Sequence, residues 1–178
     1  MAALNNNPAE KKFIVAGLIL LSAGFLFGLT GALQYILPGF LKQVFSFERT
    51  RPLHVSSIVF WILLCAIGAV FVYLQQHTGK NIYSPLLLRI QLGLFVIDII
   101  LIMVSYCFGV FGGREYWEFN PLLAIPIIAG WLLFGYNFIR SVGSMKNQPV
   151  YVWMWLTGIV FFLFTFLESY LWIFPYFS

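Results

Sequence analysis

His54 is the side chain of this sequence best suited to hold a metal. It follows Arg49, Arg51 and Pro52 closely, which predicts a place in the first turn of an apolar helix. A neutral imidazole can bind heme iron or another metal through one ring nitrogen, while its other N–H needs an acceptor that fixes the tautomer. Guanidinium groups can fork onto heme propionates, so Arg49 and Arg51 are candidate partners of the same cofactor. A histidine satisfied by water or lipid phosphate is the alternative interpretation.

The residues that follow His54 at helical spacing form one face of the same helix. They are Ile58, Trp61, Cys65 and Gly68, which run from bulky to small side chains. We expect that a flat macrocycle could lie against this face.

Two acidic residues lie three positions apart in a later loop. Glu115 and Glu118 stand beside Arg114. A carboxylate at a membrane surface could coordinate a hard cation such as calcium, particularly if heme propionates supply further oxygens. Glu115 is therefore a candidate calcium ligand, and a solvated loop with local ion pairs is the alternative.

A polar stripe is predicted along another apolar segment. Gln91, Asp98 and Ser105 recur at intervals of seven residues, which places them on one side of a helix. Because acidic groups are costly in hydrocarbon, Asp98 should face the protein interior or water. Both a proton or water route and hydrogen bonding between helices fit this pattern.

The second histidine cannot share a metal with the first. His77 comes 23 residues after His54, a separation of roughly 34 Å along one helix. Two histidines so far apart cannot make a bis-histidine heme site near one surface. The sequence also lacks a phosphate-binding glycine loop, a nucleophile paired with a base, and zinc-ligand spacing.

The composition indicates which elements position these residues. Of 178 residues, 61% are hydrophobic and 9% are charged, whereas soluble domains carry about 25% charged residues. Five apolar stretches are long enough to cross a bilayer, and they span residues 13–37, 55–74, 86–108, 121–140 and 151–177. We therefore predict an all-α integral membrane protein with five transmembrane helices in a single domain, residues 1–178. The loops leave no room for a soluble enzyme core or a nucleic-acid module.

The basic residues and the glycines add two expectations about this bundle. Six Lys and Arg residues lie on the side of the N-terminus and four on the other side, which favours a cytoplasmic N-terminus. The spacing of Gly24 and Gly28 allows another helix to approach the first one closely.

Short motifs along nearly the whole chain resemble the first five helices of the catalytic subunit of the heme-copper oxidase superfamily. The resemblance is to its branch of nitric-oxide reductases and cbb-type cytochrome c oxidases. Residues 33–35, Leu-Gln-Tyr, residues 83–85, Tyr-Ser-Pro, and residues 113–116, Gly-Arg-Glu-Tyr, with Glu118 resemble nitric-oxide reductases, whereas residues 49–54, Arg-Thr-Arg-Pro-Leu-His, are closer to cbb-type oxidases.

This resemblance implies roles for individual residues. His54 is similar in position to an axial ligand of the low-spin heme b, and Arg51 to an arginine near the heme propionates. Glu115 matches a glutamate associated with a calcium ion that bridges the propionates. In the family, later helices carry the second ligand of this heme, the proximal histidine of the high-spin heme and the ligands of the second metal. The sequence stops at Ser178, before any of them.

The resemblance also implies a function. We expect the N-terminal part of a split or truncated membrane respiratory reductase subunit, not catalytically complete alone, in a bacterial cytoplasmic membrane. A partner chain with the remaining helices would complete the heme, and cytochrome c or a quinol-linked donor would supply electrons for reduction of nitric oxide or oxygen. Two alternatives stay open: a non-catalytic membrane subunit or assembly factor of a terminal oxidase, and a small transporter or lipid-binding protein.

Overall fold

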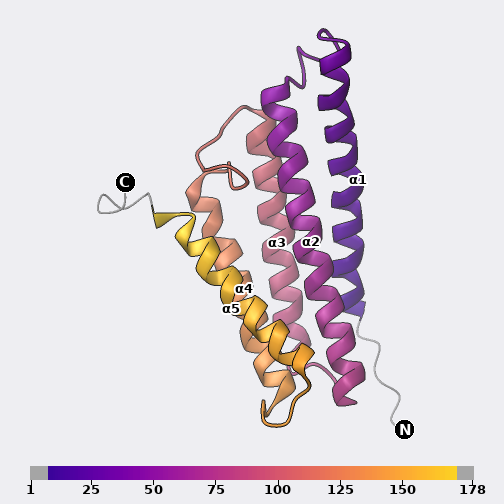
Figure 1. Ribbon diagram of the computed structural model, residues 1–178, viewed down its shortest axis with the longest axis vertical. Helices are drawn as coiled ribbons and strands as arrows, with labels where there is room; N and C mark the ends of the chain where they lie inside the picture. The colour runs from indigo at the N-terminus through magenta and orange to yellow at the C-terminus, as the bar shows by residue number, and fades with distance from the viewer. Residues whose placement is uncertain (1–7, 172–178) are drawn as a thin grey trace.

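The structure, a computed structural model that describes residues 8–171, consists mainly of long helices (Figure 1). Each of the five long segments is long and apolar enough to cross a membrane. The predicted all-α membrane fold with five spans is therefore confirmed. Its helices are α1 (Pro8–Ile36), α2 (Phe47–Thr78), α3 (Pro85–Cys107), α4 (Ala124–Val142) and α5 (Val150–Glu168), with the short 3₁₀ helix η1 (Pro121–Leu123) directly before α4.

Successive helices run in opposite directions, as short connections require. In Figure 1, α1, α2 and α3 stand side by side along the long axis of the molecule, whereas α4 and α5 are inclined to them. The most extensive packing joins α1 to α2, and α3 packs mainly on α4. The part of the chain that binds α1 to the rest of the bundle is therefore α2, the helix that carries both histidines.

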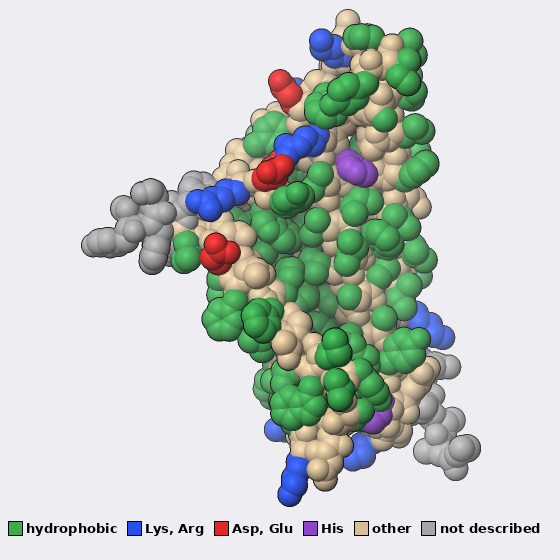
Figure 2. Space-filling model, in the orientation of Figure 1, with side chains coloured by type: hydrophobic (Ala, Val, Ile, Leu, Met, Phe, Trp, Pro, Cys, Tyr) green, Lys and Arg blue, Asp and Glu red, His purple; other side chains and the backbone are tan. Residues whose placement is uncertain are grey.

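Side chains of different kinds gather at different heights of the bundle. In the view of Figure 2, hydrophobic side chains cover most of the surface between charged groups at the two ends, and a few charged side chains also lie at the left edge near mid-height. This distribution is typical of helices that cross a hydrocarbon layer and expose their charges on either side of it.

Helix α2 begins earlier than its hydropathy predicts. It starts at Phe47, after Ser46, whose carbonyl oxygen accepts hydrogen bonds from the backbone N–H groups of Arg49 and Thr50. Pro52 consequently lies inside the helix rather than at its start, and His54 lies in the second turn rather than the first. Hydropathy misplaces the start because it detects only the part of a helix that is apolar, and the first turns of α2 are polar and charged.

Helix α5 also differs from the expected span of residues 151–177. It ends at Glu168, and the last residues of the expected span lie outside the described part of the chain.

Small residues hold α1 and α2 in close contact, as the glycine spacing predicts. A Cβ atom added at Gly24 would lie 2.9 Å from Ile58 Cδ1, and one added at Gly17 would lie 2.5 Å from Cys65 Sγ. On α2, a Cβ atom at Gly68 would lie 2.8 Å from a side-chain carbon of α1. At Gly68 the added atom would also lie 2.9 Å from the backbone oxygen of Glu10, so a side chain there would force the helices apart, whereas the end of the Ile58 side chain could move away from one at Gly24.

This packing overturns one expectation from the sequence. The face of α2 that follows His54 was predicted to be open to a flat macrocycle, but its residues Ile58, Cys65 and Gly68 pack against α1. The pattern of bulky and small side chains on α2 is complementary to a neighbouring helix. Sequence spacing alone cannot separate these two uses of one helical face.

Candidate functional site

The His54 imidazole lies half-buried where α2 packs against α1. Its Nδ1 atom is 2.7 Å from the backbone carbonyl oxygen of Gly24. Because a carbonyl oxygen can only accept a hydrogen bond, Nδ1 carries the proton in this arrangement. Nε2 then carries the lone pair, and within residues 8–171 it has no hydrogen-bond partner. This is the tautomer that a histidine needs to bind a metal through Nε2, with its other nitrogen fixed by a backbone acceptor.

Gly28 makes the space that this ring occupies. A Cβ atom at Gly28 would lie 2.7 Å from Nδ1 and 2.8 Å from Cε1 of His54, closer than real carbon contacts allow. The two glycines of α1 thus act together: Gly24 supplies the acceptor, and Gly28 supplies room for the ring.

Substitution of Gly28 by alanine should displace the His54 ring and break its hydrogen bond to Gly24. We expect a loss of about 1–3 kcal/mol in stability from overpacking and a fall of roughly 10- to 100-fold in affinity for a metal or heme held by Nε2. Thermal unfolding of the purified protein and its heme content measure the two effects.

The matched control is Gly31→Ala on the same helix, where an added Cβ would make only ordinary contacts of 3.6 Å or more. If Gly28→Ala and Gly31→Ala behaved alike, the proposed fit of the ring against Gly28 would be wrong.

Arg51 joins α2 to the loop between α3 and α4. Its Nη1 donates to Glu118 Oε1 at 2.7 Å, and its Nη2 donates to Glu115 Oε1 at 2.9 Å. The side chain of Glu118 is 14% exposed and that of Glu115 is 68% exposed, so the Glu118 pair is the better shielded of the two from solvent screening. The structure therefore brings together two of the residues predicted for the site, Arg51 and Glu115, but as partners of one another.

The loop that carries the two glutamates is tightly folded. The backbone N–H groups of Gly112 and Gly113 donate to the carbonyl oxygen of Glu118 at 2.9 and 3.2 Å. Trp117 then packs edge-on against Phe166 of α5, with ring centroids 4.8 Å apart. The loop is thus held against α5 and presents its carboxylates to Arg51, while Glu115 itself stays largely exposed to solvent.

Arg49 lies five residues before His54 on α2 and has a different environment from Arg51. Its side chain is half-buried beside Gly109, where an added Cβ would lie 3.7 Å from the guanidinium. Both ion pairs found in residues 8–171 belong to Arg51. Arg49 thus offers the guanidinium whose donors are not already committed to a carboxylate of the described chain.

The described chain has no ready-made metal cage around the two glutamates. In residues 8–171, His, Cys, Asp and Glu side chains nowhere form a group of three or more that could hold a metal ion. Glu115 and Glu118 converge on Arg51, whose positive charge lies where a cation would have to bind. A calcium ion at Glu115 would need oxygen atoms from a propionate or another chain.

The polar stripe of α3 is only partly as expected. Asp98 and Gln91 are 1% and 0% exposed, which confirms that Asp98 faces the interior. Ser105 Oγ donates to the carbonyl oxygen of Ile102 on its own helix. In the part of the chain that the structure describes, the side chains of Gln91 and Asp98 have no hydrogen-bond partner, so the expected bonds between helices are not seen there. A proton or water route remains a prediction.

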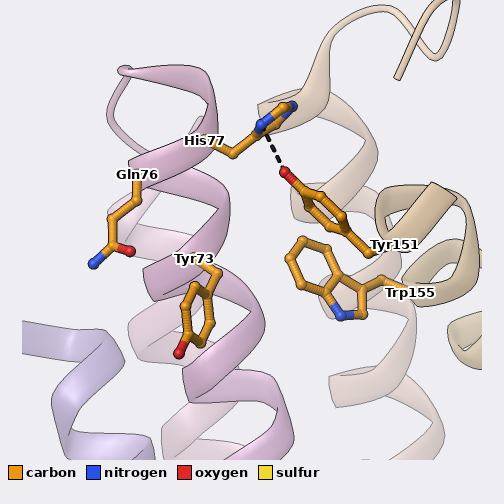
Figure 3. A pocket seen from close by; sticks show the side chains of 5 residues that line it. All are labelled: Tyr73, Gln76, His77, Tyr151 and Trp155. Carbon is orange, nitrogen blue, oxygen red and sulfur yellow. Dashed lines mark hydrogen bonds between the residues drawn. The ribbon is translucent and has the colours of Figure 1, made fainter. Parts of the chain in front are cut away.

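His77 lies at the far end of α2 and has both ring nitrogens engaged. Its Nδ1 is 2.8 Å from the Tyr151 hydroxyl, and its Nε2 is 3.0 Å from Gln148 Oε1. Figure 3 shows the bond to Tyr151 across a hollow that Trp155 and Tyr73 also line. This arrangement agrees with the expectation that the two histidines cannot serve the same iron.

The family of the chain follows from comparison with known proteins. A family model described as cytochrome c and quinol oxidase polypeptide I matches residues 9–176. The chain belongs to this family. The match confirms the resemblance found in the short motifs, and it covers all five helices.

Individual relatives include a nitric oxide reductase chain and cytochrome c oxidase chains. The chain is 28% identical to a nitric oxide reductase chain of Stutzerimonas stutzeri, over 90% of its own length and 38% of the relative. It is 30% identical to a cytochrome c oxidase subunit 1 of Rhodobacter capsulatus, over 77% of its length and 27% of the relative. It is 28% identical to a cbb3-type cytochrome c oxidase subunit CcoN1 of S. stutzeri, over 64% and 24%. The chain therefore spans about a quarter to two-fifths of these oxidase relatives.

The sequence did not predict the roles of three residues of the site in this oxidase-family chain. The sequence indicated Gly24 and Gly28 only as helix-packing residues, not as an acceptor and a space for the ring, and Glu118 was not expected to bind Arg51. The sequence held one indication of this contact: the first helix has small residues, and the second helix has a histidine near its start. Nothing in the sequence shows that the two segments align at these residues.

Proposed function

We propose that this chain is the N-terminal part of a membrane respiratory reductase subunit and contributes His54 as one axial ligand of a low-spin heme b. The observation that carries the proposal is the hydrogen bond from Nδ1 to Gly24 O, which leaves the Nε2 lone pair for iron. A bound heme would supply one-electron transfer. The chain supplies a ligand of fixed tautomer and orientation.

Arg49 is the residue we propose for the propionates. It lies five residues before His54 on α2, and its guanidinium makes no ion pair within residues 8–171. Arg51 has its donors on Glu115 and Glu118, so its proposed part is to hold the loop against α2. A propionate near Arg51 would share the guanidinium with these carboxylates. A propionate and the two carboxylates together would carry more negative charge than Arg51 can balance. A calcium ion bound at Glu115 would offset this charge, and we propose such an ion only together with heme.

The second axial ligand must come from another set of helices. The chain contains two histidines, and His77 is bonded to Tyr151 and Gln148 at the opposite end of α2. We propose that a partner chain with the remaining oxidase-like helices supplies the opposing ligand. The half-buried His54 ring, at the surface of the α1–α2 pair, is consistent with a heme shared between chains.

The proposed reaction is the reduction of nitric oxide, with reduction of oxygen as the second candidate. The nitric oxide reductase relative aligns with a larger share of this chain than the oxidases do. Electrons would come from cytochrome c or a quinol-linked donor. We propose that the chain lies in a bacterial cytoplasmic membrane. We also propose a cytoplasmic N-terminus, because six of the ten basic residues lie on that side.

One observation favours a second candidate function. The guanidinium of Arg51, which the family resemblance assigns to the propionates, is already bound by two carboxylates. A non-catalytic subunit or assembly factor that kept the fold without the heme would have this arrangement. Co-purification with an otherwise complete oxidase that contains its own full set of hemes would support this function.

Absorption spectroscopy tests the main proposal. The chain purified alone should bind heme weakly, with a high-spin spectrum, because it offers one axial histidine. The chain purified with its partner from native membranes should show six-coordinate low-spin heme. Tight low-spin binding by the isolated chain, or a heme-free complex, would contradict the proposal.

A further inference from the structure

The hydroxyl group of Tyr151 lies against a ring nitrogen of His77, where the start of α5 meets the end of α2 (Figure 3). The Tyr151 oxygen and His77 Nδ1 are 2.8 Å apart, and the two rings meet edge-on with their centroids 5.5 Å apart. A hydroxyl group and an imidazole nitrogen can each donate or accept. The neighbours of the pair therefore decide which atom carries the proton.

Gln148 decides the direction of this hydrogen bond. Its Nε2 donates to the backbone carbonyl oxygen of Ser144 at 2.9 Å, and a carbonyl oxygen can only accept. The other end of the amide, Oε1, therefore faces His77 Nε2 at 3.0 Å, so Nε2 carries the hydrogen. In a neutral imidazole Nδ1 then has the lone pair, and it accepts the hydrogen bond from the Tyr151 hydroxyl.

This arrangement suits a tyrosine that loses an electron and a proton together. An oxidised phenol is a strong acid, and a base that takes its proton must lie within hydrogen-bond distance. His77 Nδ1 meets this condition. After the transfer both N–H groups of the imidazolium have acceptors, the Tyr151 oxygen for Nδ1 and Gln148 Oε1 for Nε2. The product therefore leaves no polar group of the pair without a partner.

Trp155 is the aromatic neighbour that can exchange an electron with Tyr151. It lies one turn further along α5, and the two ring centroids are 5.0 Å apart. Indole and phenol rings are among the side chains that one-electron oxidants attack most readily. Figure 3 shows the Tyr151 hydroxyl directed at His77 and the Trp155 ring beside the Tyr151 ring. Tyr151 thus has one neighbour for its proton and another for its electron.

Trp155 is not an isolated ring. It lines a hollow between α2 and α5 together with Trp131 of α4. The Trp131 ring centroid lies 4.0 Å from that of Phe162, and the Phe162 centroid lies 6.2 Å from that of Trp117 in the loop before α4. Aromatic rings therefore lead from Tyr151 through the interior toward the opposite end of the bundle.

We propose that Tyr151 is a redox-active tyrosine that gives one electron to oxidised Trp155 and its proton to His77. The Trp155 radical cation gains the electron and becomes a neutral indole. The O–H bond of Tyr151 breaks and an N–H bond forms at His77 Nδ1, so the products are a neutral tyrosyl radical and an imidazolium. A strong metal-centred one-electron oxidant makes the Trp155 radical cation and takes up its electron. This inference does not depend on heme at His54.

Flash photolysis of the full chain in detergent, with ruthenium(II) tris-bipyridine and a sacrificial electron acceptor, tests the proposal. The photogenerated ruthenium(III) complex is the oxidant, and transient absorption and freeze-trapped electron paramagnetic resonance identify the radicals. Wild-type protein should show an indole radical that decays as a tyrosyl radical grows. Tyr151→Phe should lose this conversion. Tyr73→Phe is the matched control, since Tyr73 lines the same hollow and is also exposed, whereas the hydrogen bond to His77 belongs to Tyr151.

His77→Phe tests the proton acceptor, because it removes the base and keeps a ring of similar size. The conversion should slow roughly 100-fold, the lower end of what a positioned base contributes. The largest g value of the tyrosyl radical should also rise, because this value reports the hydrogen bond to the phenoxyl oxygen. A purely structural role of His77 would leave the g value unchanged.

Gln148→Ala is a second variant that leaves both rings in place, should His77→Phe fail to fold. It removes the acceptor that keeps the hydrogen on His77 Nε2, so a share of the molecules would carry it on Nδ1 and the conversion should slow. Gln76→Ala is the matched control, since Gln76 lines the same hollow, and it should convert at the wild-type rate.

Equal conversion rates in wild type, His77→Phe and Gln148→Ala would overturn the proposal. So would a tyrosyl signal that persists unchanged in Tyr151→Phe. If Trp155→Phe still converted indole radicals into the Tyr151 radical at the wild-type rate, Trp155 would not be the electron partner.

Discussion

If His54 is the heme ligand that we propose, its replacement by alanine is expected to abolish the low-spin heme spectrum of the complex with the proposed partner chain. His54 Nε2 is the ligand atom we propose, and no second histidine of this chain lies near it, because His77 is bonded elsewhere. Alanine removes both the ligand and the hydrogen bond to Gly24. The fold should survive, since one such hydrogen bond contributes only about 1 kcal/mol. Reduced-minus-oxidised spectra and heme content per chain measure the effect.

His77→Ala is the matched control, and it should leave the heme spectrum unchanged. Added imidazole should partly restore the low-spin spectrum of His54→Ala, because a free imidazole can occupy the vacated ligand position. A purely structural role for His54 would give no such rescue. An unchanged spectrum in His54→Ala would remove the proposed heme role of this chain.

Replacement of Gly113 by alanine is expected to give the largest loss of stability of any single methyl addition described for this protein. A Cβ atom at Gly113 would overlap the carbonyl group of Trp117, so backbone rather than a flexible side chain has to move. We expect a loss of about 3 kcal/mol, or a fall of roughly 10 °C in the melting temperature. Thermal unfolding of the detergent-solubilised protein, followed by tryptophan fluorescence, measures this.

The same change should release the loop from α2, because Gly113 N–H also donates to Glu118 O. Gly112→Ala is the matched control: its Cβ would come no closer than 3.3 Å to Asn120 Cα, a contact that a small shift relieves. If Gly113→Ala melted like Gly112→Ala, the close turn between residues 113 and 117 would not exist in solution.

Much of the architecture could be predicted from composition, because a bilayer selects long apolar helices regardless of how they pack. The five spans and the close approach at Gly24 and Gly28 are examples. The start of α2 could not be predicted in this way, because Ser46 caps a polar turn that hydropathy treats as loop. The face of α2 from Ile58 to Gly68 was wrongly predicted to be open to a flat macrocycle for a related reason. The pattern of large and small side chains on a helix does not show whether another helix or a cofactor lies against it.

The candidate site likewise has features that residue type predicts and features that only the structure shows. Residue type was enough to single out His54, Arg49, Arg51 and Glu115, since few side chains can ligate iron or bind carboxylates and propionates. Their pairing depends on contacts 30 to 67 residues apart along the chain. The amino-acid sequence by itself determined that this chain contains five membrane-spanning helices and one histidine placed to bind a metal. Only the tertiary structure decided that Gly24 fixes the histidine tautomer and that Glu115 and Glu118 occupy Arg51, because hydrogen bonds between helices depend on their relative height and rotation, which no local pattern encodes.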